Sequence, residues 1–330
     1  MSYQLQHVVH MRSIDRDISS YPDPNQYRTV LSHPINIPHG HLCVASVMTA
    51  QIPFSFYPVN SKNNTLKIEL NGTNPVDGDE VVTAAEFTLT AGNYTATELR
   101  DEIQSKLRDG VVFSDTDDAR AELPKIEVEY DSKINKYKFT VTGKQDGDNP
   151  ELVNVIIKSG TTCGKLLGLP SNQVTADTDF NAGDGREASV IFTSPYSINV
   201  AGDDTLYLRT NLGTGRSMSY ETRTQNSGDL LAKIPIRVSP FSIIHYDADE
   251  STFKAQIKEG GQIDEISVRL TDSENRLVDF NGIDNEISIK FEVIRKSNHE
   301  DYELMKRDPY KQDRTLFPKN RGPPPTKDSK

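Results

Sequence analysis

The stretch Met11-Arg-Ser-Ile-Asp-Arg-Asp-Ile-Ser-Ser-Tyr-Pro-Asp-Pro-Asn-Gln-Tyr-Arg-Thr-Val-Leu31 places a charged segment directly before a strand. Pro22 and Pro24 hold the residues before them in extended conformations and remove two backbone donors, so no helix can begin there. From Tyr27 to Leu31 the side chains alternate as in a half-buried strand. We therefore predict a polar anchor that leads into the first strand of a β-structure.

Strand signals recur in the second half of the chain at the short, regular spacing of a β-sandwich or jelly roll. We predict strands over 188–193, 204–210, 228–238, 241–247, 263–270, 275–280 and 285–294. The clearest alternation is that of Ile287, Ile289, Phe291 and Val293. Near the N-terminus a further strand is predicted over 41–51, after a loop over 32–40 that contains two prolines and a glycine.

Between these groups of strands, residues 64–170 have a different pattern. Thr95-Ala-Thr-Glu98 has the spacing of a capping box, in which each outer side chain satisfies a backbone donor at the start of a helix. Apolar residues follow at a spacing of four up to Leu107, which predicts an amphipathic helix over 96–109. Strand patterns flank this helix, so we predict a small α+β unit inserted into the sandwich.

The tail over 295–330 differs from the rest of the chain in charge and composition. It holds ten Lys and Arg against six Asp and Glu, whereas the whole chain has a net charge of −11. Its prolines and few apolar residues predict no regular structure for the tail alone. We hypothesise that it is an arm that orders on a neighbouring subunit; the alternative is a dispensable, solubilising terminus. The anchors of the arm would be Tyr302, Leu304, Met305, Tyr310, Leu316 and Phe317.

Together these patterns predict a mainly β fold, a jelly-roll-like β-sandwich with an inserted small α+β unit and an extended C-terminal tail. The length of 330 residues is sufficient for two compact units. The predicted parts are an N-terminal anchor with the first sandwich strands (1–63), the inserted α+β unit (64–170), the remainder of the sandwich (171–294) and an extended or disordered arm (295–330).

Composition excludes several classes of function. A net charge of −11 argues against general nucleic-acid binding, which needs clustered Lys and Arg to neutralise phosphates. The N-terminal residues lack the basic and apolar regions of a signal peptide, and no apolar run is long enough to span a bilayer. Cys43 and Cys163 have no CxxC spacing, which favours two buried thiols over a disulfide between them. Synthesis in the cytoplasm is therefore expected.

No pattern predicts catalysis, a cofactor or a bound metal. His39, His41 and Cys43 would share one face of a strand. A zinc site needs about four ligands, however, and no second cluster of His or Cys accompanies them, so exposed histidines beside a buried thiol are the preferred interpretation. The run Asp177–Asn181 resembles the start of a calcium loop but lacks the glycine and the bidentate glutamate that such a loop needs. We predict a protein that is not an enzyme.

The charged segment before the first strand allows two interpretations. In one, its arginines form bidentate pairs with carboxylates of another subunit, and its tyrosines bury aromatic area in the same contact. In the other, the same groups clip the terminus to its own sandwich, and the aspartates cap turns. The residues concerned are Arg12, Asp15, Arg16, Asp17, Tyr21 and Tyr27.

The string Ser13-Ile-Asp-Arg-Asp-Ile-Ser-Ser-Tyr-Pro-Asp-Pro-Asn-Gln-Tyr27 resembles the N-terminal signature of capsid proteins from large icosahedral DNA viruses, of the chlorella virus and marseillevirus kind. Further strings strengthen the resemblance, because they follow in the order of the family's layout from residue 12 to about residue 294. They are Ala50-Gln-Ile-Pro-Phe-Ser-Phe-Tyr57, Thr90-Ala-Gly-Asn-Tyr-Thr-Ala-Thr-Glu-Leu99, Leu166-Leu-Gly-Leu169 and Leu231-Ala-Lys-Ile-Pro235.

The resemblance implies a minor capsid protein, a structural component of the virion whose jelly-roll-like body lies under or between major capsid subunits and fixes their spacing. The implied partners are the major capsid protein, other minor capsid proteins and further copies of the chain, with a peripheral contact to an internal viral membrane also allowed. The penton protein of the fivefold vertex is the alternative within the family. A carbohydrate-binding or carbohydrate-active β-sandwich is the alternative of another class, although the chain contains no Trp to stack on sugars.

Overall fold

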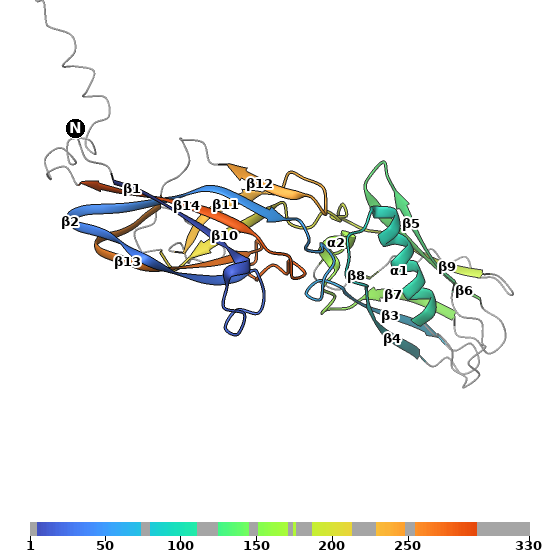
Figure 1. The fold of residues 1–330 in the computed structure, drawn as a ribbon. Coiled ribbons are helices and arrows are strands. Elements are labelled where there is room, and N and C mark those ends of the chain that lie inside the picture. The colour runs from blue at the N-terminus through green and yellow to red at the C-terminus, as the bar shows by residue number, and fades with distance from the viewer. Residues whose placement is uncertain are drawn as a thin grey trace, which may run out of the picture.

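The computed structural model describes residues 5–73, 80–110, 125–144, 151–170, 174–175, 187–212, 229–247 and 255–295. Figure 1 shows an elongated molecule with two units, a β-sandwich and a smaller unit that contains both helix and strands. The arm predicted over 295–330 lies outside the described residues except for Arg295, and so do all of its predicted anchors. The acidic run 177–181 lies outside them as well.

The sandwich contains β1 (Leu5–Arg12), the short 3-10 helix η1 (Ser13–Asp15), β2 (Gln26–Pro53), β10 (Thr205–Thr210), β11 (Leu230–Pro235), β12 (Ile243–Asp247), β13 (Ala255–Thr271) and β14 (Glu286–Arg295). The smaller unit contains β3 (Thr65–Thr73), β4 (Glu80–Thr88), α1 (Ala96–Gly110), β5 (Lys125–Asp131), β6 (Lys136–Lys144), β7 (Glu151–Ile157), α2 (Gly164–Leu167), β8 (Val174–Thr175) and β9 (Glu187–Thr193). Strands dominate both units, which confirms the predicted mainly β fold.

β2 and β13 form a long antiparallel ribbon that folds back on itself. The first half of β2 pairs with the second half of β13 over residues 26–37, and the pairing resumes over residues 42–45 of β2 after a shift in register. At this shift Gly40, Gly260 and Gly261 have positive φ angles, which residues with a side chain rarely adopt. The glycines therefore allow the ribbon to pass from one layer of the sandwich to the other.

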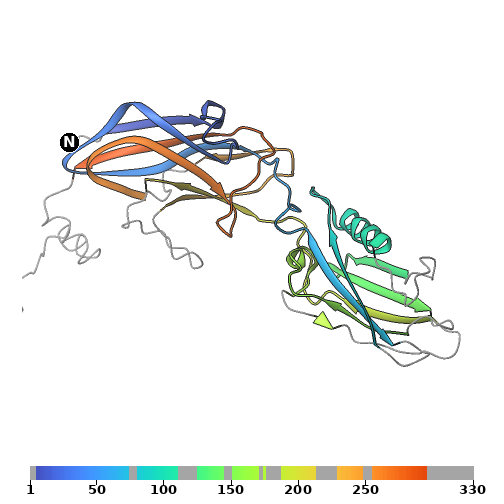
Figure 2. The same ribbon diagram turned by 90° about the horizontal axis from the view of Figure 1, so that it is seen from below.

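The folded ribbon organises two antiparallel layers. One layer has the order β1, β14, second half of β2, and beyond β2 both β12 and the first half of β13, which pair with different parts of that strand. The other has the order first half of β2, second half of β13, β10, β11. Two antiparallel layers joined by a folded ribbon are the arrangement of a jelly roll, so the predicted fold class is confirmed. Figure 2 shows the sandwich and the smaller unit at opposite ends of the molecule.

The side chains between the two layers form a single hydrophobic core. On β14 the alternating residues from Ile287 to Val293 point into it and are almost fully buried, as the sequence pattern predicts. Two other predictions were wrong. The segment over 32–40 is part of β2 rather than a loop, and residues 275–280 contribute only an isolated bridge between Leu277 and Thr271.

The inserted unit packs α1 against two small sheets, ordered β4, β3, β7, β8 and β5, β6, β9. At the start of α1 the Thr95 N–H donates to Glu98 Oε2 at 2.8 Å, and the Glu98 N–H donates to Thr95 Oγ1 at 3.2 Å. The predicted capping box is therefore formed. Leu99, Ile103 and Leu107 are buried in the core of this unit, on the apolar face that the spacing of four predicts.

The strand predicted over 188–193 lies in the inserted unit and not in the sandwich. It is β9, which pairs with β6, and its Phe192 ring stacks on Phe139 at a centroid distance of 4.7 Å. The core of the inserted unit also takes in Val59 and Ile198, which lie on either side of the predicted range 64–170. Local sequence pattern shows that a strand exists, but only long-range pairing decides which sheet receives it.

The inserted unit leaves the sandwich after β2 and returns to it before β10. Near this junction Lys62 Nζ donates to the Leu277 carbonyl at 2.7 Å, and Lys165 Nζ contacts Glu274 Oε1 at 3.0 Å. Arg295, the last described residue, lies at the other end of the sandwich, beside the fold of the ribbon. The described ends of the chain and the inserted unit therefore lie at opposite ends of the jelly roll (Figure 1).

Candidate interaction surfaces

Arg16 is the centre of the charged segment between β1 and β2, and its side chain binds its own chain. Its Nη1 contacts Asp284 Oδ1 at 2.7 Å and the Ser13 carbonyl at 2.8 Å. Its Nε and Nη2 donate to the carbonyls of Tyr21 at 3.0 Å and Pro22 at 3.1 Å. Only 10% of the side chain is exposed. These contacts of Arg16, called the clip below, hold the segment against the loop before β14.

Tyr27 extends the same clip into the core. Its ring is 1% exposed, and its hydroxyl donates to Asn285 Oδ1 at 3.0 Å. Asn285 Nδ2 in turn donates to the Pro24 carbonyl at 2.9 Å, and the Ser13 N–H donates to the Asn285 carbonyl at 2.9 Å. Burial raises the pKa of the Tyr27 hydroxyl well above its usual value. Tyr27 is thus a buried hydrogen-bond donor and offers no ring to a partner.

The other charged residues of the segment lie on its surface. Arg12 Nε contacts Asp15 Oδ2 at 2.9 Å, and both side chains are more than half exposed. Asp17 accepts hydrogen bonds from the Ser19 and Ser20 hydroxyls, which lower the pKa of its carboxyl. The structure therefore favours the clip for Arg16 and turn capping for Asp17, whereas a partner role for this segment stays a proposal. Tyr21, which is half-buried, is the remaining member of the predicted set.

Two apolar residues of the segment, Ile14 and Ile18, are exposed to solvent. They are 60% and 65% exposed. Sequence reasoning selected the charged residues of the segment and passed over these two. The signal that could have found them is their position, because an isoleucine within a polar loop has no strand or helix periodicity to bring it into a core.

β1 is an outer strand, and one of its edges has no partner among the described strands. The Ser13 N–H points to β14, where it donates to Asn285. Because the direction of backbone groups alternates along an extended chain, the N–H and C=O groups of Val8 and His10 face the open edge. Leu5 and Val8 also expose about half of their side chains. β1 therefore presents both backbone hydrogen-bonding groups and apolar surface.

β12 is the outer strand on the opposite side of the same layer. It pairs with residues 49–53 of β2, and its other edge has no partner among the strands that the structure describes. The Ser242 carbonyl accepts a hydrogen bond from the Phe54 N–H, so by the same alternation the backbone groups of His245 face the open edge. Ile243 is 50% exposed beside this edge.

Phe241, in the turn before β12, combines an unusual backbone with an exposed ring. Its φ is +65°, a region that bulky residues rarely occupy, and its side chain is 76% exposed. The Phe241 N–H donates to the Phe54 carbonyl at 2.8 Å, which holds the turn against β2. A strained aromatic residue that turns away from the core is a candidate contact residue. Sequence reasoning placed it inside a strand and missed it.

The histidines and cysteines do not form a metal site in the part of the chain that the structure describes. His39 and His41 lie where the ribbon folds, and the His41 ring contacts the His39 carbonyl at 3.3 Å. Cys43 is buried in the core of the sandwich and Cys163 in that of the inserted unit, and both thiols are free. Burial raises the pKa of Cys43 to about 11 and that of Cys163 to about 12. Neither thiol is a reactive nucleophile at neutral pH.

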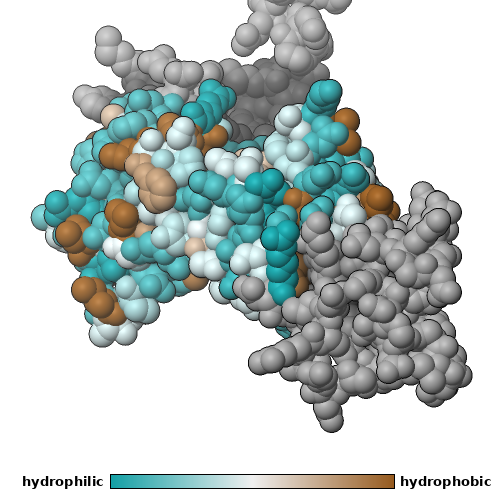
Figure 3. Space-filling view, turned by 90° about the vertical axis from the view of Figure 1, so that its right-hand side faces the viewer, coloured by the Kyte–Doolittle hydropathy of each residue, from teal (hydrophilic) through white to brown (hydrophobic). Residues whose placement is uncertain are grey.

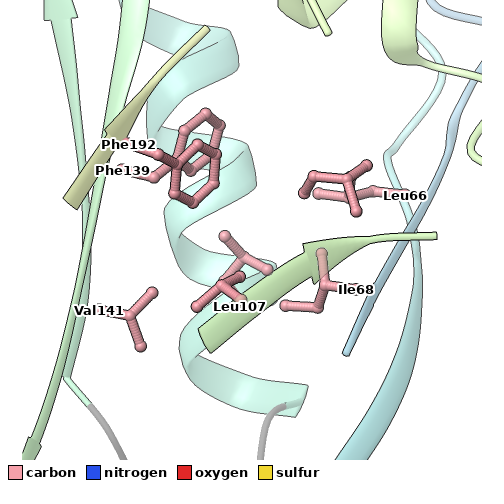
Figure 4. Close-up of a pocket in the computed structure, with 8 residues that line it drawn as sticks. Leu66, Ile68, Leu107, Phe139, Val141 and Phe192 are labelled. Carbon is pink, nitrogen blue, oxygen red and sulfur yellow. The ribbon is translucent and has the colours of Figure 1, made fainter. Parts of the chain in front are cut away.

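A small hollow lies inside the inserted unit, between α1 and its two sheets (Figure 4). Its lining is entirely apolar: Leu66, Ile68, Leu107, Phe139, Val141, Val155, Ile157 and Phe192. No polar group faces it that could orient a substrate or bind a sugar hydroxyl. The hollow is a packing space of the core and does not suit the carbohydrate-binding alternative.

The described part of the end of the inserted unit is mostly polar. Figure 3 looks onto this end, and the hydrophobic residues in its coloured part appear as separate spots rather than as one continuous patch. Scattered single hydrophobic residues are normal for a surface in water. Within the described residues, no helix has the length and apolar character needed to cross a bilayer.

Comparison with known proteins gives one family match. A model described as "Family of unknown function (DUF5901)" matches residues 4–254. The minor capsid family suggested by the sequence is not the family that this match names. No match was found among curated proteins.

Two solved structures match the chain at low sequence identity. One is the mavirus penton protein, with 11% identity, a TM-score of 0.46, and coverage of 88% of this chain and 100% of that one. The other is a chain from the Sputnik virophage structure, with 13% identity, a TM-score of 0.42, and coverage of 89% and 98%.

Proposed function

The chain belongs to the DUF5901 family, whose function is unknown, and we propose that it is a non-enzymatic structural subunit in the capsid of a large icosahedral DNA virus. The observation that carries this proposal is the polarity of the jelly roll. The described ends of the chain lie at one end of the sandwich, and a separate unit projects from the other; the coloured part of its end in Figure 3 is mostly polar. The capsid-like strings from Ser13 to Pro235 point to the same class of protein.

This polarity suits a shell protein. A sandwich that stands in the wall of a shell needs one end directed inward and one directed outward, with its sides available to neighbours. Here the connection that carries the inserted unit and the clip around Arg16 lie at one end, and the fold of the β2–β13 ribbon lies at the other. The two open edges, on β1 and β12, lie on the sides. The inserted unit would then project from the shell surface.

Two roles within the shell were predicted from the sequence, and the geometry favours the vertex. A protein that spaces major capsid subunits needs extended surfaces along the shell, whereas a penton protein needs a compact body with neighbours on two sides. The sandwich matches the second description, because its open edges lie on opposite sides of one layer. We therefore propose a fivefold-vertex role, with lattice spacing as the alternative. The neighbouring major capsid protein would be the main heterologous partner.

Quantitative mass spectrometry of purified particles tests this proposal. Cross-links would be read from the same sample, in order to identify the neighbours. We expect the chain in intact particles, at the copy number of the vertex subunits and with cross-links to the major capsid protein. A much higher copy number would support the spacing role instead. Absence from particles that contain the major capsid protein would refute the capsid assignment.

The same cross-links test the C-terminal arm. If the arm anchors on a neighbouring subunit, lysines between Lys306 and Lys330 should cross-link to other shell proteins. A chain that ends at residue 295 should then enter particles less efficiently while its sandwich still folds. Unchanged incorporation of the shortened chain would favour a dispensable terminus.

A further inference from the structure

The two open edges of the first sandwich layer are complementary in direction. Neighbours in the order β1, β14, β2, β12 are all antiparallel, so β1 runs parallel to β2 while β12 runs the opposite way. If β1 of one copy lay beside β12 of a second copy that is rotated from the first about an axis along the strands, the two strands would be antiparallel. Antiparallel pairs form short, straight hydrogen bonds and need no rearrangement of either strand.

The two edge strands also share a row of paired residues that crosses the layer. His10 is opposite Ser288 on β14, and Ser288 is opposite Thr49 on β2. Thr49 is in turn opposite Asp247 on β12. His10 and Asp247 therefore occupy the same row of the layer, at its two ends. A row that continued into a second copy would place an imidazole beside a carboxylate, which is a favourable pair.

The outer strands of the other layer differ in a way that supports a selective contact. They are the first half of β2, which contains Pro34, and β11, which contains Lys233 and Pro235. Proline and lysine on an edge strand are common means of preventing pairing with another chain. β1 and β12 contain neither residue. Proline thus occurs in both outer strands of the other layer and is absent from β1 and β12.

We propose that β1 of one copy pairs with β12 of a second copy, so that one layer of the sandwich continues from subunit to subunit. This proposal rests on the structural role proposed above and names the surface through which the copies meet. Exposed apolar residues accompany both strands: Ile14 and Ile18 follow β1, and Phe241 and Ile243 flank the start of β12. They would supply the apolar part of the contact, to which backbone hydrogen bonds add register.

Such a contact is heterologous, because a different surface of each copy takes part. Heterologous contacts build closed rings when the rotation between copies is a whole fraction of a turn. A ring is the form that a vertex subunit requires. Pairing of β1 with β1 of a second copy would instead give a closed dimer and would leave both β12 edges open.

Single-cysteine variants can distinguish these arrangements in the full-length protein. His10→Cys and Asp247→Cys each place one thiol on one of the two edges, while the native Cys43 and Cys163 are buried. The purified variants are treated with a short bis-maleimide reagent, first separately and then as a mixture. We expect covalent dimers in the mixture and none in either variant alone. A mixture of His10→Cys with Val30→Cys, whose thiol lies on the edge that contains Pro34, is the matched control and should stay monomeric.

Two results would overturn the proposal. One is the absence of dimers in the mixture of His10→Cys and Asp247→Cys at concentrations where the control is also monomeric. The other is dimer formation by His10→Cys alone, which would show pairing of β1 with β1. If the chain is nevertheless found in particles at the vertex copy number, the structural role stands and only this contact is wrong. If dimers form but the chain is absent from particles, the contact between β1 and β12 stands and the structural role in the capsid is wrong.

Proline substitutions test the backbone hydrogen bonds separately. In the row that joins His10 to Asp247, Arg12 would lie opposite His245, and the N–H groups of both residues face the open edges. Arg12→Pro and His245→Pro each remove one of these N–H groups and leave the ladder inside the subunit intact. Placed in the cysteine variants, each should reduce the yield of covalent dimer by about tenfold or more, the change that about 1.4 kcal/mol of association free energy produces. Val30→Pro, on the edge with Pro34, is the control and should not change the yield. Equal yields for all three would refute pairing through the strand edges.

Discussion

Replacement of Arg16 by Met should lower the free energy of unfolding of the sandwich by about 3 kcal/mol. The guanidinium group contacts the Asp284 carboxylate and donates to the carbonyls of Ser13, Tyr21 and Pro22, with only 10% of the side chain exposed. Met keeps the apolar stem and removes every one of these donors. A buried acceptor without a donor costs about 1–3 kcal/mol. The total cost of leaving these acceptors without a donor is reduced, because the Asp284 side chain is 35% exposed and can bind water instead.

Urea unfolding followed by far-UV circular dichroism measures this change. With a urea dependence of about 1–3 kcal/mol per M, a loss of about 3 kcal/mol moves the midpoint by about 1 M or more. Arg12→Met is the matched control, because Arg12 lies four residues away, carries the same charge and is more than half exposed. Its ion pair with Asp15 is on the surface, so its removal should leave the midpoint unchanged within error.

Two results would refute the clip. Equal midpoints for Arg16→Met and Arg12→Met would show that the buried contacts of Arg16 stabilise nothing. Unchanged stability of Arg16→Met together with loss of the cross-linked dimer would show that Arg16 acts on a partner, which is the other interpretation of the segment. Hydrogen exchange over residues 13–25 adds a local readout, because loss of the clip should speed exchange there before the sandwich unfolds.

Three further predictions concern stability. Asp229→Asn should cost about 3 kcal/mol, because Arg209 is 1% exposed and would face Arg269 without the carboxylate that contacts both; thermal unfolding measures this loss. Gly168→Ala should cost about 2–4 kcal/mol in the same assay, because its φ is +68° and a methyl group would overlap a main-chain carbonyl. Burial raises the pKa of Cys163 to about 12, so the thiol's contribution to stability should be complete below pH 9 and should decrease progressively above it. Urea unfolding at several pH values, compared with that of Cys163→Ala, isolates this contribution.

Each of these predictions has a result that contradicts it. A loss for Asp229→Asn no larger than that of Glu129→Gln, which removes an exposed ion pair with Lys138, would show that the buried carboxylate is not needed. Gly282 has a similar positive φ but open space around it, so Gly282→Ala should cost less than Gly168→Ala, and equal losses would exclude the steric overlap. A parallel pH dependence for Cys163→Ala and the unmodified chain would show that the thiol is not the titrating group.

Local signals in the sequence predicted local structure well. The capping box at Thr95 and Glu98 forms as expected because both of its hydrogen bonds lie within one helical turn. The alternation from Ile287 to Val293 predicted a buried strand face because burial of these side chains depends on their spacing along a single strand. In both places the residues that decide the structure are close together in the sequence.

Predictions that depend on distant partners were less successful. β9 was assigned to the sandwich because its own pattern carries no information about β6, the strand with which it pairs. The segment over 32–40 was predicted to be a loop because it contains Pro34 and Pro38, yet it continues β2. Proline is tolerated there because that part of β2 is an edge strand and needs no N–H on its open side. Whether a strand is central or at an edge cannot be read from the strand itself.

The same limit explains why the segment around Arg16 was difficult to interpret. Charged residues on a loop suggest a polar contact surface, but a guanidinium group with a carboxylate and several carbonyls in reach is more stable when it is buried among them. Because Arg16 turns inward, the loop is fixed with its isoleucines, Ile14 and Ile18, on the outside. The charged residues thus determine the shape of the segment, and the apolar residues that they display beside β1 are the ones available to a second copy.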